Sequence, residues 1–101
     1  DDVLALQPGW LQEMVAHALR PEIGAVGAML RFPDGSVQHA GVVTGVGGVA
    51  GHVHYRLPRE AAAACPQLAT ARNYSAVTAA CMVVRRERFL RVGGFDEGLP
   101  V

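Results

Sequence analysis

Two pairs of acidic residues in this sequence have side chains that could bind a metal ion or act as a general base. Asp1 and Asp2 are adjacent carboxylates, and oxygen ligands of this kind suit hard cations such as Mg²⁺ or Mn²⁺. On spacing alone, such a pair is more often solvated surface charge than a metal site, and both interpretations stay open at this point. Asp96 and Glu97 follow a glycine pair on a predicted loop, where a carboxylate can act as a general base or cap a following helix.

The histidines offer a different chemistry. His52 and His54 lie two residues apart, so in an extended segment both rings project to one side, and Cys65 could join them around zinc. The paired ligand spacing of a structural zinc site is not visible, which makes zinc a minor alternative. His39 lies in a predicted hairpin, on the face that carries Val37, Gly41 and Val43. A buried, hydrogen-bonded side chain is the usual role there, although the two small residues that follow leave room for a ligand.

The elements that must position these residues follow from periodicity and turn signals. We predict helices over 8–20, 58–64 and 86–92, a buried strand over 24–30, a hairpin with a turn at 32–35 and a strand at 36–43, a glycine-rich loop over 45–51, and a strand over 73–84 buried on both faces. Cys81 is expected to be buried within that last strand. Mixed helices and strands predict an α/β or α+β domain.

Composition excludes several classes of protein. The 101 residues carry no net charge and only 18% charged side chains, which excludes the basic surface of a nucleic-acid-binding protein. Half of the residues are hydrophobic, which excludes intrinsic disorder. No apolar run reaches the roughly 18 residues of a membrane span. Two cysteines without a paired motif fit a reducing compartment, so we expect a cytoplasmic location.

Six phrases, in this order and spacing, resemble a family 2 glycosyltransferase of the GT-A fold, most closely the bacterial rhamnosyltransferase-like enzymes. They occupy residues 1–3, 8–11, 20–27, 33–41, 74–81 and 92–97. The resemblance implies a partial GT-A fold: one mixed sheet with a β-hairpin and flanking helices, forming a single partial domain over 1–101. It also implies a fragment, the C-terminal half of a catalytic domain, and we expect it to be inactive alone because the nucleotide-binding half is absent.

The resemblance further implies transfer of a sugar from a nucleotide-diphosphate donor to a glycan or lipid-linked acceptor, with inversion, at the inner face of the membrane. In the family a D-x-D-like motif holds Mg²⁺ or Mn²⁺, a role that falls here on Asp2 with Asp1 as the middle residue. Asp96 falls beside the acceptor, with the main catalytic base expected beyond Val101. The substrate-binding positions implied are His39, Thr78, Ala79 and Glu97.

A rival hypothesis needs no sugar transfer. Strand edges left exposed could pair with a second copy of the chain, which predicts a self-associating, non-catalytic module and a homo-oligomer.

Overall fold

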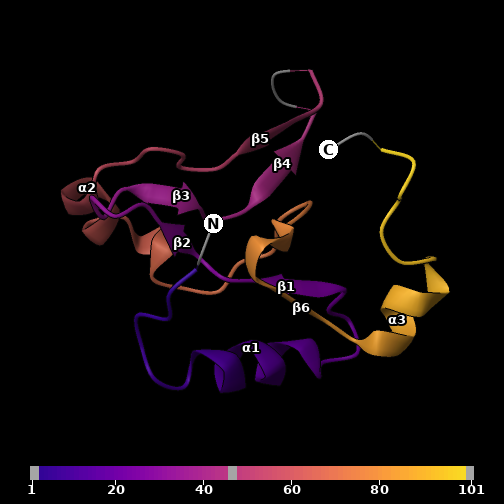
Figure 1. The fold of residues 1–101 in the computed structure, drawn as a ribbon. Coiled ribbons are helices and arrows are strands. Elements are labelled where there is room, and N and C mark those ends of the chain that lie inside the picture. Colours follow the sequence, from indigo (N-terminus) through magenta and orange to yellow (C-terminus); the bar gives the residue numbers. More distant parts are fainter. Residues whose placement is uncertain (1–2, 46–47, 100–101) are drawn as a thin grey trace. The chain divides into compact units, whose positions relative to one another are not determined.

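The computed structural model describes residues 3–45 and 48–99, which group into two compact units. The first unit comprises Gly27–Met82 with Val3, and the second comprises Leu4–Val26 with residues 83–99. Each unit is described by itself below. The elements, labelled in Figure 1, are α1 (Trp10–Ala18), β1 (Ala25–Gly27), β2 (Leu30–Arg31), β3 (Val37–His39), β4 (Val42–Thr44), β5 (Ala50–His52), α2 (Arg59–Ala63), two 3₁₀ turns (Pro66–Leu68 and Ala79–Cys81), β6 (Met82–Val84) and α3 (Arg86–Arg91).

Helices and strands are mixed, in agreement with the α/β class predicted. The strands of the described residues do not form one mixed sheet, however. They form three two-stranded sheets, β1 with β6, β2 with β3, and β4 with β5. The boundary between the two units runs through β1 and β6. The GT-A fold therefore stays a prediction.

The predicted hairpin is confirmed in the first unit. Strands β2 and β3 pair antiparallel, with Leu30 opposite His39, and lie side by side in Figure 1. Their turn closes where the Gly35 N–H donates to the Phe32 carbonyl oxygen at 2.8 Å. Gly35 has a φ of 85°, a left-handed conformation that glycine adopts without a steric penalty. Val37 on β3 is fully buried and anchors the core of this unit.

The strand predicted over 36–43 is interrupted at Gly41, which separates β3 from β4. Gly41 has a φ of 127°, and a β-carbon built on it would lie only 2.3 Å from Cδ2 of Tyr74. The bend redirects the chain, so Val43 is 36% exposed whereas Val37 and His39 are buried. The alternation predicted over 36–43, which puts Val43 on the face of His39, is therefore broken at Gly41.

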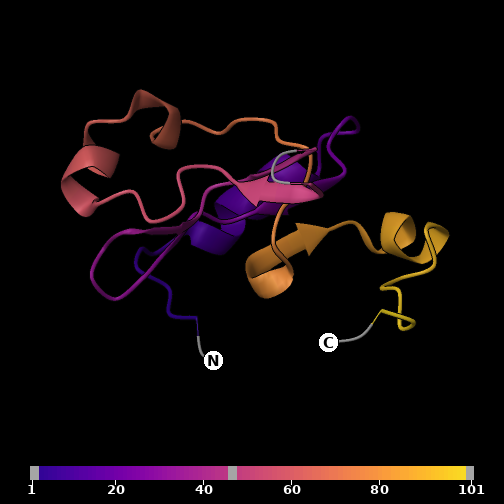
Figure 2. The same cartoon turned by 90° about the horizontal axis from the view of Figure 1, so that it is seen from above.

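The glycine-rich segment predicted as a loop over 45–51 ends in a strand, because Ala50–His52 form β5 of a second hairpin. Strands β4 and β5 pair antiparallel, with Val42 opposite His52 and Thr44 opposite Ala50 (Figures 1 and 2). Gly45 has a left-handed φ of 84°, and its N–H donates to the Val49 carbonyl oxygen at 2.9 Å. The pairing carries His52 back beside β4.

The single strand predicted over 73–84 is wrong over most of its length. Ala76 makes only an isolated bridge with Val42, and residues 79–81 form a 3₁₀ turn. The Thr78 hydroxyl oxygen accepts a hydrogen bond from the Ala80 N–H at 3.3 Å, which favours a turn over an extended ladder. In Figure 2 this orange coil leads directly into β6. Cys81 is consequently half-buried and not buried as predicted.

In the second unit, the predicted first helix is confirmed but begins later. Helix α1 starts at Trp10, after Gly9 takes a left-handed φ of 80°, so Pro8 precedes the first turn. The strand predicted as buried over 24–30 shortens to β1, which is exposed at Ala25 and half-buried at Val26 and Gly27. Only Met14 and Ala18 of α1 are buried.

Two arginines of the second unit hold the C-terminal end of α1 and the segment that follows it. Arg85 Nε donates to the Ala18 carbonyl oxygen at 3.0 Å, and its Nη2 donates to Leu19. Arg88 on α3 donates to the carbonyl oxygens of Ile23, at 2.6 Å, and Pro21. Positive charge at a helix C-terminus is stabilising, so these arginines serve the fold and do not form a basic surface.

Helix α3 ends as predicted, at a glycine pair. The Gly93 N–H donates to Leu90 and the Gly94 N–H to Phe89, at 3.1 and 2.9 Å, with both glycines left-handed. This is a Schellman motif.

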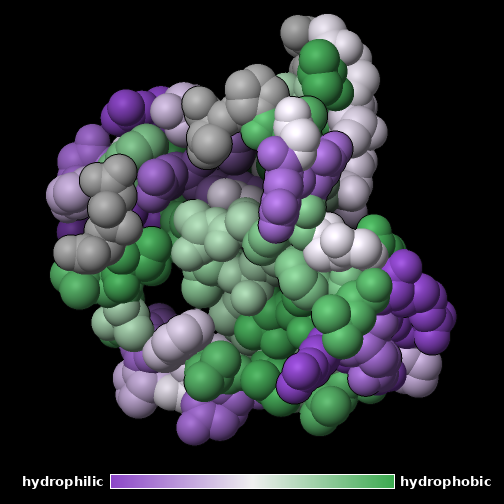
Figure 3. Space-filling model, turned by 45° about the vertical axis from the view of Figure 1, so that its right-hand side comes forward, coloured by the Kyte–Doolittle hydropathy of each residue, from purple (hydrophilic) through white to green (hydrophobic). Residues whose placement is uncertain are grey.

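Several large apolar side chains stay exposed, and hydrophobic (green) areas of the surface lie beside hydrophilic (purple) ones in Figure 3. No helix in the described ranges is both long enough and apolar enough to cross a membrane.

Candidate functional site

A cavity of about 310 Å³ lies entirely within the first unit. Strands β2, β3 and β5, the turn that follows β5, and the segment that enters the second 3₁₀ turn all contribute to its walls. The lining residues are Leu30, Phe32, Gln38, His39, His52, Tyr55, Thr78 and Ala80. Residues from 30 to 80 therefore converge on one site.

The most specific feature of this cavity is a pair of histidines in contact. Nδ1 of His39 lies 3.2 Å from Nδ1 of His52, and the two rings meet edge to face at 84°. On its other side, His39 accepts a hydrogen bond at Nε2 from the backbone N–H of Thr78, at 3.3 Å. The β2–β3 hairpin positions His39, and the β4–β5 hairpin positions His52.

The Thr78 contact determines where the protons lie in this pair. A backbone N–H can only donate, so Nε2 of His39 must carry a lone pair, and the neutral ring is protonated on Nδ1. That Nδ1–H then donates to Nδ1 of His52, which must accept and is protonated on Nε2. Both lone pairs of the histidine pair are therefore already bound by N–H groups.

Burial keeps His39 neutral. Only 2% of its surface is exposed, and this desolvation lowers the pKa of His39 below its ordinary value, with repulsion from His52 adding to the effect. Protonation would also place an Nε2–H against the Thr78 N–H. At neutral pH His39 is therefore uncharged and hydrogen-bonded on both ring nitrogens.

Aromatic rings form another wall of the cavity. Tyr55 lies 5.8 Å from the His52 ring and meets Phe32 edge to face at 6.0 Å. The guanidinium of Arg56 covers Phe32, 4.0 Å from the ring centroid, a stabilising cation–π contact. The backbone N–H of Arg56 also donates to the Val37 carbonyl oxygen at 2.8 Å, which ties the turn after β5 to β3.

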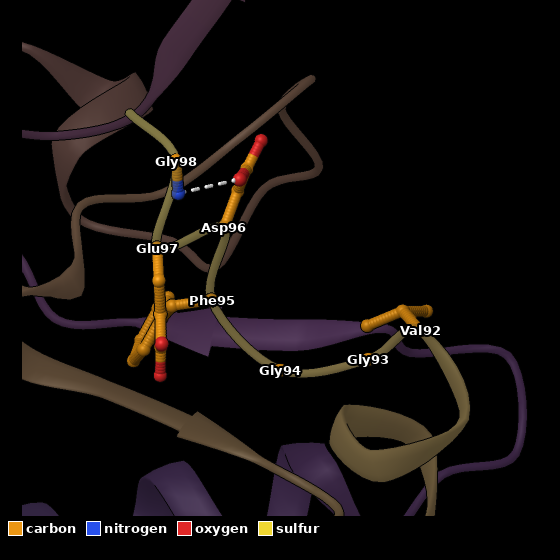
Figure 4. Close-up of a pocket in the computed structure, with 7 residues that line it drawn as sticks. All are labelled: Val92, Gly93, Gly94, Phe95, Asp96, Glu97 and Gly98. Atoms are coloured by element: carbon orange, nitrogen blue, oxygen red, sulfur yellow. Dashed lines mark hydrogen bonds between the residues drawn. The ribbon is translucent and has the colours of Figure 1, made fainter. Parts of the chain in front are cut away.

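A second hollow, of about 700 Å³, is formed in the other unit by the loop from Val92 to Gly98 (Figure 4). Asp96 accepts a hydrogen bond from the Gly98 N–H at 2.9 Å, so its carboxylate closes the loop on itself. The side chains of Asp96 and Glu97 point to different sides of this loop in Figure 4. Both are exposed to solvent.

The structure brings together part of the predicted site. His39 and Thr78 are joined by a hydrogen bond, whereas Ala79 is exposed beside them and does not line the cavity. Asp96 and Glu97 belong to the other unit. Asp1 and Asp2, the predicted metal ligands, lie outside the described residues, so their role and the binding of Mg²⁺ or Mn²⁺ stay predictions.

The zinc alternative is not supported in the part of the chain that the structure describes, which holds no group of three metal-binding side chains. His54 has a left-handed φ of 56°, so His52 and His54 do not alternate as in an extended strand. His52 contacts His39 instead, and the Cys65 thiol donates to Gln67 Oε1 at 2.9 Å.

Sequence reasoning missed the contact between His39 and His52 and the place of Tyr55 in the same wall. The signal available in the sequence was a pair of short segments, 42–44 and 50–52, on either side of a glycine-rich stretch, an arrangement compatible with a hairpin. Had that hairpin been recognised, the pairing of β5 with β4 would have carried His52 back toward the strand that follows His39.

Two curated proteins resemble nearly the whole chain. Over 97 residues, 96% of this chain, it is 58% identical to "Uncharacterized protein y4gI" of Sinorhizobium fredii. Over 103 residues, which cover 100% of this chain, it is 50% identical to "O-antigen biosynthesis protein RfbC" of Myxococcus xanthus. The chain spans only 11% and 8% of their lengths. No protein-family model and no solved structure matches the chain.

Proposed function

We propose that this chain is part of a glycosyltransferase that acts in polysaccharide biosynthesis. The observation that carries the proposal is the 50% identity, along the whole chain, with a protein named for O-antigen biosynthesis. The order of the six family 2 motifs in the sequence supports the finer proposal, transfer of a sugar from a nucleotide-diphosphate donor.

The described site is compatible with such a substrate. Sugars present hydroxyl groups that need hydrogen-bonding partners and C–H faces that pack on aromatic rings. The cavity combines Gln38, Thr78 and the histidine pair with the ring of Tyr55. Polar groups placed among apolar and aromatic side chains are usual in a binding site for a small molecule.

The proposed reaction is an inverting displacement. The acceptor oxygen forms a bond to the anomeric carbon, the bond from that carbon to the diphosphate oxygen breaks, and a carboxylate base takes the acceptor's proton. In this proposal Asp96 lies beside the acceptor. Asp1 and Asp2 would hold Mg²⁺ or Mn²⁺, and the charge of that ion would stabilise the departing diphosphate.

The test uses the full-length natural protein that carries this sequence. It is incubated with UDP-, GDP- and dTDP-linked sugars and with lipid-linked saccharide acceptors, with Mn²⁺ or with a chelator, and nucleoside diphosphate release and glycan product are measured. We expect acceptor-dependent release with at least one donor, abolished by Asp2→Asn and reduced by Asp96→Asn. Glu13→Gln, an exposed acid on α1, is the matched control and keeps full activity. Absence of release with every donor contradicts the proposal.

Self-association through strand edges stays a prediction of its own. The described strands have only two or three residues each, so each edge offers few unpaired backbone groups. The mass measured by light scattering tests it: a dimer that is indifferent to nucleotide sugars and shows no transfer would favour the non-catalytic module.

A further inference from the structure

The histidine pair can donate a hydrogen bond to a ligand but cannot accept a proton from one. A general base needs a free lone pair, and both lone pairs here are taken, His39 Nε2 by Thr78 and His52 Nδ1 by His39. What remains is the Nε2–H of His52, which has no protein partner among residues 3–45 and 48–99. His52 is exposed and lines the cavity. The pair therefore presents one oriented N–H donor.

The cavity favours an uncharged ligand. No arginine, lysine or carboxylate is among its lining residues, and the guanidinium beside its aromatic wall, that of Arg56, is stacked on Phe32, so a diphosphate or carboxylate entering it would lose water for little counter-charge. Its volume of about 310 Å³ equals that of roughly ten water molecules, enough for a single sugar ring. Tyr55, 52% exposed, offers an aromatic face beside the donor.

We propose that this cavity binds one neutral sugar ring, with the His52 Nε2–H donating to a sugar hydroxyl oxygen, and that His39 is a positioning residue that fixes His52 in the donating tautomer. The inference rests on the proposed function and deepens it, because it assigns a monosaccharide subsite to the first unit. His39 does not need to touch the sugar. It holds Nδ1 of His52 and is itself held by Thr78.

Binding is tested on the full-length protein by saturation-transfer NMR, which observes the ligand. The probes are the methyl glycosides of rhamnose, galactose, mannose and N-acetylglucosamine at millimolar concentration, without nucleotide sugar. Ala80→Leu extends an exposed side chain at the cavity wall, and we expect it to reduce binding at least tenfold. Ala63→Leu, the same change at an exposed position of α2, is the control and retains binding.

Two amide substitutions at His39 separate positioning from a merely structural role. The amide nitrogen of asparagine occupies the place of Nδ1, so His39→Asn still donates to His52. The amide of glutamine occupies the place of Nε2, so His39→Gln can satisfy Thr78 but loses the bond to His52. We expect His39→Asn to retain the affinity and His39→Gln to lose about tenfold, close to the loss in His52→Phe. His54→Asn, at a left-handed position outside the cavity, leaves binding unchanged.

The outcomes distinguish this inference from the proposed function. If no glycoside binds, or if Ala80→Leu binds as well as Ala63→Leu, the subsite is overturned, even where sugar transfer is observed. If His39→Gln binds as tightly as His39→Asn, the positioning role is overturned. Glycoside binding with these variant effects, in a protein that transfers no sugar, supports the subsite and contradicts the transferase.

Discussion

Gly41 is the position at which a single methyl group should do the most damage to the first unit. A β-carbon there would lie 2.3 Å from Cδ2 and 2.5 Å from Cγ of Tyr74, so either the ring or the backbone must move. Overpacking of this kind costs about 1–3 kcal/mol, and an alanine held at a φ of 127° adds about 1–3 kcal/mol of backbone strain. We therefore expect Gly41→Ala to lower the free energy of unfolding by about 2–6 kcal/mol, a large share of the 5–15 kcal/mol typical of a domain.

Gly45→Ala is the matched control. Gly45 also has a positive φ, 84°, but nothing lies within 4 Å of a β-carbon built there, so only about 1–2 kcal/mol of strain is expected. Hydrogen exchange of peptides covering β3 and β4 measures the local opening free energy in both variants. In the double variant Gly41→Ala/Tyr74→Ala, removal of the ring should recover part of the loss, giving a coupling energy of about 0.5–3 kcal/mol. A Gly41→Ala variant no less stable than Gly45→Ala, or a cycle without coupling, would refute the reasoning.

Further predictions concern the arginine contacts and the buried histidine. Arg88→Ala should cost about 1.5–3 kcal/mol, because it removes charged donors from the Ile23 and Pro21 carbonyls, while Arg86→Ala, exposed on the same helix, should cost less than about 0.5 kcal/mol. Urea unfolding of the chain followed by the fluorescence of its one tryptophan, on α1 of the same unit, measures both, and equal losses would contradict the assignment. Because the pKa of His39 is lowered in the folded protein, His39 in the unfolded chain binds a proton at a higher pH than in the folded chain. The contribution of His39 to the free energy of unfolding is therefore full above about pH 6.5 and declines below it. His39→Asn should flatten this decline in pH-dependent urea titrations, and an unchanged slope would count against a neutral, buried His39.

Local signals in the sequence predicted the elements whose stability is local. Helix α3 and its end at Gly93–Gly94 follow from a periodic segment before two glycines, and the β2–β3 hairpin follows from the turn at 32–35. These structures are decided within a few residues of the chain. The same holds for α1, apart from its first turn.

The failures lie where distant segments meet. The strand predicted over 36–43 bends at Gly41 because Tyr74 occupies the space beside it, and the strand predicted over 73–84 becomes a 3₁₀ turn whose Thr78 N–H binds His39. Alternation of side chains between the two faces describes only the local preference of a segment for an extended strand. A contact across more than thirty residues can override that preference, because the buried ring or the buried N–H must find space and a partner.

By itself, then, the sequence determined the class of the fold, helices α1 and α3, and the first hairpin. It also indicated His39 and Thr78 as candidate site residues. Only the tertiary structure decided that these two share a hydrogen bond and that His52 completes the pair. The physical reason is that a tautomer depends on which groups surround each ring nitrogen. Those groups come from two hairpins and a turn that are separate in the sequence and meet only in the folded unit.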